Sequence, residues 1–247
     1  MKEFYINDDG IRLHAKLDMP ADRSGKCPLV IVIHGFTGHM EERHIVALHE
    51  TLNENGYASL RVDMYGHGKS EGEFKNHNIF KWINNALCVV DYAKKLDFVS
   101  DLYLCGHSQG GFLTTIIAGM RPDDFKAIMP LSPALMIPDS ARKGEVLGVK
   151  IDPDHYPDEI DLYHLKLSGD YFRTARLLHP EESMHLYHKP VLIVYGEKDP
   201  AVPIRYVVDA QKEYDDCKLV IIPDDDHGYS LHLDEMLKAV TDFLKDN

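Results

Sequence analysis

Short apolar runs alternate with amphipathic stretches along most of the chain, a pattern typical of parallel strands joined by crossover helices. Residues 4–7 and 11–18 alternate apolar and polar positions around the turn Asp8-Asp9-Gly10, which predicts an antiparallel hairpin at one edge of a sheet. Residues 28–33 are continuously apolar, as expected of a strand covered on both faces. The pattern therefore predicts an α/β protein whose sheet centre begins at this run.

The alternation continues to residue 131 and resumes at residue 191. We expect strands over 58–62, 102–105, 127–131, 191–195 and 218–222, and helices through 45–52, 79–96, 112–120, 204–214 and 231–243. From about residue 132 to 188 prolines, tyrosines and polar clusters replace the periodicity, over a length that exceeds normal connections inside a sheet. We predict one domain over 1–247, with a mostly parallel sheet, helices on both faces and a lid or insertion at about 134–187, after the sixth strand.

Composition excludes several classes of protein. The 247 residues are 44% hydrophobic and 27% charged, and no apolar run approaches the roughly 18 residues that a membrane helix needs. A net charge of −13 with dispersed basic residues disfavours nucleic acid and anionic membranes as partners. The N-terminus has no apolar signal core, which predicts a cytoplasmic protein. The four cysteines form no C-x-x-C pair, so we expect neither disulfides nor a metal or other cofactor. We leave open whether the protein forms a homodimer.

A candidate nucleophile lies between a predicted strand and a predicted helix. Gly106-His107-Ser108-Gln109-Gly110 matches the G-x-S-x-G turn, in which a sharp strand-to-helix connection holds the serine in a strained backbone conformation. Small residues at 106 and 110 avoid collisions with the adjacent backbone. Because two glycines around a serine also arise by chance in a chain with 17 glycines, the interpretation depends on the other loops.

The loop after residues 28–33 is placed to complete an oxyanion hole. It reads His34-Gly35-Phe36-Thr37-Gly38, and this architecture puts the backbone N–H of Phe36 beside that of Gln109 at the substrate carbonyl oxygen. The alternative is a plain glycine-containing turn. We predict Phe36 and Gln109 as the two donors.

Two later loops supply an acid and a base. Asp199 follows the strand at 191–195, and His227 follows the strand at 218–222, which gives the chain order nucleophile, acid, base. Glu197 is the main alternative to Asp199, which we favour because prolines stiffen the loop after it. We therefore predict that His227 takes the proton of Ser108 while Asp199 orients the imidazole, so that an acyl-enzyme forms on the serine and is then hydrolysed.

Two other polar segments are assigned no chemistry. Asp224, Asp225 and Asp226, just before the candidate base, are expected to be solvated turn residues. The glycines of residues 61–70 do not complete G-x-G-x-x-G and no helix follows at once, so we expect a structural turn rather than a dinucleotide site.

Taken together, the motifs resemble the α/β-hydrolase superfamily over nearly the whole chain: H-G-F-T-G, D-M-Y-G-H-G-K-S, G-H-S-Q-G-G, G-E-K-D and D-H-G. More narrowly, three longer stretches resemble the cinnamoyl or feruloyl esterases of gut bacteria: P-L-V-I-V-I-H-G-F-T-G-H, L-S-P-A-L-M-I-P and D-P-D-H-Y-P-D-E-I-D. The resemblance implies a serine carboxylesterase that acts on small-molecule hydroxycinnamate esters, with the insertion as a lid over the acyl pocket.

By the same resemblance Tyr171 contacts the substrate from the lid and Tyr163 lines the entrance. Ser140 stands where relatives have an acidic residue for the phenolic hydroxyl, with Asp139 beside it. For both tyrosines simple lid packing is the alternative. A monoacylglycerol lipase or thioesterase, and a non-catalytic binding protein of the same fold, are the competing functions.

Overall fold

The computed structural model describes residues 1–21 and 25–247, and eight of its strands make one central sheet. These strands are β1 (Lys2–Asp8), β2 (Ile11–Asp18), β3 (Cys27–Ile33), β4 (Ala58–Val62), β5 (Val99–His107), β6 (Ala127–Leu131), β11 (Val191–Gly196) and β12 (Cys217–Ile222). The larger helices are α1 (Arg43–Glu54), α2 (Ile79–Lys94), α3 (Gln109–Met120), α6 (Pro180–Leu186), α7 (Arg205–Glu213) and α8 (Leu233–Asp246).

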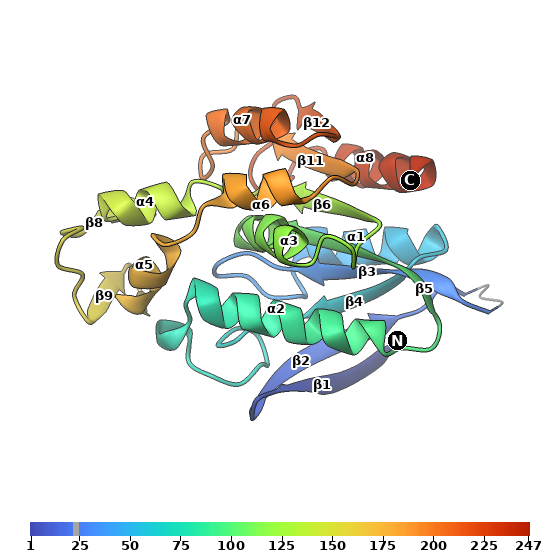
Figure 1. The fold of residues 1–247 in the computed structure, drawn as a ribbon, viewed down its shortest axis with the longest axis horizontal. Helices are drawn as coiled ribbons and strands as arrows, with labels where there is room; N and C mark the ends of the chain where they lie inside the picture. Colours follow the sequence, from blue (N-terminus) through green and yellow to red (C-terminus); the bar gives the residue numbers. More distant parts are fainter. Residues whose placement is uncertain (22–24) are drawn as a thin grey trace.

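The sheet has the order β1-β2-β4-β3-β5-β6-β11-β12 (Figure 1). β1 and β2 form the predicted antiparallel hairpin, and β2 also pairs antiparallel with β4. All other neighbours are parallel. The predicted mostly parallel sheet is therefore confirmed, and the carboxyl ends of its central strands share one edge.

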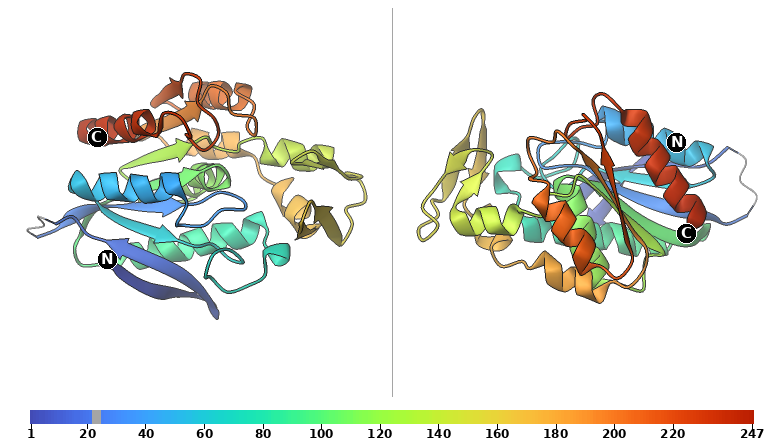
Figure 2. Two further views of the ribbon diagram at one scale, coloured as in Figure 1. Left: turned by 180° about the vertical axis from the view of Figure 1, so that it is seen from behind. Right: turned by 90° about the horizontal axis from the view of Figure 1, so that it is seen from above.

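Helices cover both faces of the sheet, with α1 and α8 on one and α2, α3, α6 and α7 on the other (Figure 2). β3 explains why its sequence is apolar at every position. Leu29, Ile31 and Ile33 belong to the core under α2 and α3, while Val30 and Val32 belong to the core under α1 and α8. A strand buried on both faces cannot alternate with polar residues.

Two elements begin three residues earlier than predicted. β5 begins at Val99 rather than at residue 102, because Val99 already pairs with Cys27 of β3, ahead of an irregularity in the register. α3 begins at Gln109 rather than at residue 112, although its first turn contains Gly110 and Gly111. Glycine weakens a helix, so the tertiary contacts of this turn outweigh its local propensity.

The chain between β6 and β11 holds the predicted insertion. It contains α4 (Ile137–Lys143), α5 (Asp170–Ala175) and two small hairpins, β7 (Glu145–Val146) with β8 (Val149–Lys150) and β9 (Glu159–Leu162) with β10 (Leu165–Ser168). Figure 1 shows these elements beyond one end of the sheet, whereas α6 lies with α3 in the helix layer. The part that projects therefore ends before α6. No helix in the described ranges is long and apolar enough to cross a membrane.

The packing of α6 on α3 depends on Gly119. A Cβ atom at this position would lie 2.5 Å from Cα of Ser183 in α6, a distance that real contacts do not reach. Met184 and Tyr187, just beyond, belong to the hydrophobic core. α6 therefore belongs to the body of the domain, although its residues fall within the predicted lid range.

We expect Gly119→Ala to lower the free energy of unfolding by about 2 kcal/mol, because the added methyl group must push two backbones apart. Urea unfolding followed by circular dichroism measures the change. Met120→Ala, at an exposed neighbouring position, is the matched control and should shift the midpoint little. Equal stability of Gly119→Ala and the unmodified protein would contradict this packing.

Candidate active site

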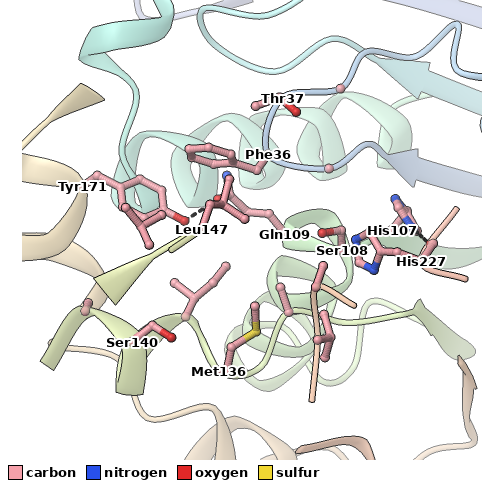
Figure 3. Close-up of a pocket in the computed structure, with 18 of the residues that line it drawn as sticks. Phe36, Thr37, His107, Ser108, Gln109, Met136, Ser140, Leu147, Tyr171 and His227 are labelled. Carbon is pink, nitrogen blue, oxygen red and sulfur yellow. Dashed lines mark hydrogen bonds between the residues drawn. The ribbon is translucent and has the colours of Figure 1, made fainter. Parts of the chain in front are cut away.

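The loops that follow β3, β5, β11 and β12 meet at the carboxyl edge of the sheet and enclose a cavity of about 230 Å³. In open α/β sheets this edge is where ligands bind. The lining comes from the sheet loops and from the insertion: Gly35, Phe36, Thr37, Gly38, Glu42, His107, Ser108, Gln109, Ala134, Met136, Ile137, Ser140, Ala141, Glu145, Val146, Leu147, Tyr171, Phe172, Ala201, Val202 and His227. Ser108 lies near the middle of this cavity (Figure 3).

Ser108 has the strained backbone that its motif predicts. Its φ is 56° and its ψ is −117°, a conformation that side-chain-bearing residues rarely adopt. A Cβ on Gly106 would lie 2.3 Å from the carbonyl oxygen of Gly110, and a Cβ on Gly110 would lie 2.3 Å from the carbonyl oxygen of Ile33. The two glycines are therefore required by close backbone approach, as the sequence indicated.

The backbone of the turn is held from both sides. Ser108 N–H donates to the carbonyl of Leu131 at 2.9 Å, and its own carbonyl accepts from Phe112 and Ala134, each at 3.0 Å. These bonds tie the turn to the neighbouring strand β6 and to α3. The strained conformation is thus fixed by its surroundings rather than left to relax.

His227 and Asp199 form the predicted pair. His227 Nδ1 lies 2.6 Å from Asp199 Oδ2, and the Asp199 side chain is fully buried. The other oxygen, Oδ1, accepts from the backbone N–H groups of Ala201 at 2.7 Å and Val202 at 2.9 Å. Both oxygens therefore have partners, and the imidazole is held with Nε2 free of this contact.

Ser108 and His227 line the same cavity and lie next to each other in Figure 3. Among the described residues no hydrogen bond joins them. In structures without substrate such bonds are often long and shorten in the reacting complex. The structure thus brings the predicted nucleophile, base and acid to one site.

Glu197, the alternative acid, points elsewhere. Its carboxylate accepts the backbone N–H of Asp224 at 3.1 Å, and this hydrogen bond holds the pKa of Glu197 below its usual range. It makes no contact with His227 within the described chain.

The expectation of a solvated turn residue is wrong for Asp225, while Asp226 is partly exposed. Asp225 is fully buried, and its carboxylate accepts backbone N–H bonds from Asp226, Leu231 and His232 at 2.9–3.1 Å. Asp226 Oδ1 accepts from the N–H groups on either side of the loop tip, at residues 228 and 230. These carboxylates build the loop that carries His227, whereas Asp224 is exposed as expected.

His107 is a support that the motif did not identify, because it stands at a variable position of G-x-S-x-G. Its Nε2 lies 2.7 Å from the carbonyl oxygen of His227, and its ring centroid lies 4.7 Å from that of His227. Complete burial lowers the pKa of His107 well below the ordinary value. A neutral ring that donates from Nε2 leaves Nδ1 without a proton, consistent with the absence of a partner there among the described residues.

Phe36 and Gln109, the residues of the two predicted oxyanion donors, both line the cavity. The backbone N–H groups of Phe36 and Gln109 donate to no protein atom in the described part of the chain. Gln109 is the first residue of α3, where backbone N–H groups lack helical partners and the helix dipole favours negative charge. The carbonyl of Phe36 contacts Nε2 of His67, which fixes the orientation of its peptide.

The segment at residues 61–70 is the structural turn that the sequence predicts, and it braces the Phe36 loop. Asp63 accepts from the N–H groups of Met40 and Lys69, each at 2.9 Å, and contacts His14 Nδ1 at 2.9 Å. A Cβ on Gly68 would lie 2.2 Å from this carboxylate. Within the described residues, no group of three or more His, Cys, Asp or Glu side chains is arranged to hold a metal ion.

The predicted acyl-side residues divide into two pairs. Tyr171 and Ser140 line the cavity. The Tyr171 hydroxyl donates to Gln109 Oε1 at 2.7 Å, and burial raises its pKa. The insertion therefore contacts the residue that follows Ser108.

Asp139 and Tyr163 are not brought into the cavity. Asp139 lies on the other side of α4, where it pairs with Arg142 and accepts from the Tyr206 hydroxyl at 3.0 Å. Tyr163 is 78% exposed and donates to the carbonyl of Leu147, a residue that does line the cavity. Adjacent helical residues point in different directions, which is why Ser140 and Asp139 cannot share one surface.

Known proteins with this fold match the chain over most of its length. The family model described as serine aminopeptidase, S33 matches residues 25–158, and that described as TAP-like protein matches residues 171–247. Est1E from Butyrivibrio proteoclasticus with ferulic acid bound is 56% identical, with a TM-score of 0.97 over 98% of each chain.

Curated relatives are more distant. Human palmitoyl-protein thioesterase ABHD10, mitochondrial, is 27% identical over 72% of this chain and 59% of its own length. Human protein ABHD12B is 24% identical over 88% of this chain and 60% of its own length. The match thus spans no more than 60% of these relatives. With the family models, the 56% identical structure and the mostly parallel sheet in agreement, the chain belongs to the α/β-hydrolase superfamily.

Proposed function

We propose that this protein is a carboxylic ester hydrolase that cleaves hydroxycinnamate esters, of the ferulate, caffeate or coumarate type, through an acyl-enzyme on Ser108. The observation that carries the proposal is the cavity, which joins Ser108 and His227 to an apolar pocket beneath the insertion. A flat aromatic acid needs such a pocket, with a few polar groups to orient it.

The reaction follows from the positions of the side chains. Ser108 Oγ attacks the ester carbonyl carbon while His227 Nε2 takes its proton, and Asp199 stabilises the resulting imidazolium. The carbonyl oxygen becomes negative within reach of the N–H groups of Phe36 and Gln109, and each such donor contributes about 3 kcal/mol to transition-state stabilisation. The intermediate collapses, His227 protonates the departing alcohol, and water then releases the acid by the same steps.

The acyl side of the cavity is shaped by the insertion, which acts in this proposal as the lid. Met136, Ile137 and Ala141 come from α4 and the turn before it, and Val146 and Leu147 from the β7 hairpin. Tyr171 and Ser140 add hydroxyl groups to this apolar wall. The ferulic acid in the structure of Est1E, 56% identical to this chain, supports the same class of acid here.

A thioesterase or monoacylglycerol lipase is the second candidate, since the same nucleophile and base serve thioesters and glycerol esters. The observation that favours it is the similarity to palmitoyl-protein thioesterase ABHD10.

A matched panel of substrates separates these candidates. We expect kcat/KM for methyl ferulate to exceed that for a monoacylglycerol and for a palmitoyl thioester by at least about tenfold, because selectivity reports differential binding of the transition state. Spectrophotometric initial rates at equal enzyme concentration provide the comparison. A preference for the palmitoyl thioester would replace the proposed substrate class with the second candidate.

We expect Ser108→Ala to lower kcat by at least about 10⁴-fold, because no other group can form the acyl-enzyme. The measurement is steady-state hydrolysis of methyl ferulate together with labelling by a fluorophosphonate probe. Labelling of the unmodified protein but not of the variant is the expected result. Absence of labelling in both, with no loss of activity in the variant, would support a non-catalytic binding protein instead.

We expect Asp199→Asn to lower kcat about 10⁴-fold, because the amide no longer holds the imidazole tautomer that leaves Nε2 able to accept a proton. Glu197→Gln is the matched control, since it removes the rival carboxylate from the same loop, and its kcat should stay within about twofold of the unmodified enzyme. The opposite ranking of the two variants would reassign the acid to Glu197.

A further inference from the structure

Glu42 is an acidic side chain in the cavity that the proposed mechanism does not use. It lines the cavity together with Ser108 and His227. Its Oε2 is buried and has no hydrogen-bond partner among the described residues. Burial raises the pKa of Glu42, while His39 and His227 nearby act in the opposite direction. A buried polar atom without a partner is uncommon and requires an explanation.

The fold holds this carboxyl group in place from behind. Gly38 provides the room, because a Cβ on Gly38 would lie 2.1 Å from Glu42 Oε2 and 2.7 Å from its Cδ. Glu42 also occupies the N-cap of α1, yet its side chain makes no capping hydrogen bond. The carboxyl group therefore packs against Gly38 at the cavity lining and leaves its own helix uncapped.

Glu42 lies on the His227 side of Ser108. Arg43, the next residue, donates from Nη1 to the carbonyl of Ser230 at 3.2 Å, which joins the start of α1 to the loop that carries His227. The insertion residues form the other side of the cavity, and Figure 3 shows Ser140, Leu147 and Tyr171 away from His227.

The two sides of the cavity receive different halves of the ester. The base protonates the departing alcohol, so the alcohol must lie beside His227 and the acyl group must extend the other way. Glu42 therefore lines the part of the cavity that receives the alcohol half, where a hydroxyl group could donate to its carboxyl group.

We propose that Glu42 determines specificity for the alcohol half: it accepts a hydrogen bond from a hydroxyl group close to the ester oxygen and so selects esters of polyhydroxylated alcohols. This inference rests on the proposed cleavage at Ser108, which defines where the alcohol leaves, but not on the identity of the acid. A hydrogen bond to a charged group, formed in a partly buried site, discriminates by about tenfold or more.

The test compares ethyl ferulate with 2-hydroxyethyl ferulate, which differ by the one hydroxyl group. We expect the ratio of kcat/KM, hydroxyethyl over ethyl, to fall about tenfold or more in Glu42→Met, which keeps the length of the side chain but removes the acceptor. Carboxymethyl ferulate, with an anion at the same place, should gain relative to ethyl ferulate in this variant at about pH 8, because the like charge is removed.

Glu50→Met is the matched control, since Glu50 lies exposed on the same helix outside the cavity, and it should leave both ratios unchanged. Thermal unfolding confirms that both variants fold. Unchanged ratios in Glu42→Met would overturn the proposal. An equal loss for all three esters with a displaced pH profile would also overturn it, because Glu42 would then act through His227 as a positioning residue.

Failure of the proposed acid specificity has a different signature. The unmodified enzyme would then be labelled by the fluorophosphonate probe yet hydrolyse none of the ferulate esters. In that event the ethyl and 2-hydroxyethyl esters of the acid that the enzyme accepts repeat the comparison, and the same change of ratio is expected in Glu42→Met.

Discussion

The close approach of three backbone segments at the Ser108 turn is the constraint on which the rest of the site depends. Gly106 meets Gly110, and Gly110 meets the end of β3, at distances that exclude any side chain. This approach forces Ser108 to a φ of 56°, a strain on the order of 1–3 kcal/mol that the surrounding hydrogen bonds offset. It also makes Gln109 the first residue of α3, so that its N–H group has no helical partner and is available to the ester oxygen in the proposed reaction.

Hydrogen bonds to buried carboxylates, rather than apolar packing, determine the conformation of the two loops next to this turn. Asp225 gathers three backbone N–H groups and so determines the course of the loop that carries His227. Asp63 does the same for the segment whose His67 contacts the carbonyl of Phe36. A fully hydrogen-bonded buried carboxylate is costly to disturb, because removal of one partner leaves a desolvated group. The site is therefore organised before a substrate binds.

The central sheet could be predicted because each strand is either continuously apolar or alternates, and both patterns are local. The insertion could be located by its loss of periodicity, but its short helices and hairpins could not be predicted, because they are stabilised by contacts with distant segments, as in the bond from Tyr171 to Gln109. α6 shows the same limit: its position in the helix layer depends on Gly119, 64 residues away from Ser183 in sequence. Long-range contact of this kind leaves no periodic signal within the segment itself.

Some residues of the candidate site could likewise be predicted from the sequence, and others could not. Ser108 and His227 follow parallel strands whose carboxyl ends lie at the same edge of the sheet, so their proximity could be predicted from their positions in the chain. Ser140 and Asp139 are adjacent on α4, yet only Ser140 lines the cavity, because consecutive helical residues point in different directions. Composition does not reveal which of the two does so. The sequence did not indicate a role for Glu42, because an acidic residue at the start of a helix is ordinarily explained by its favourable interaction with the helix dipole. Its place in the cavity lining and its buried, unpartnered oxygen distinguish Glu42 from a residue that merely begins a helix.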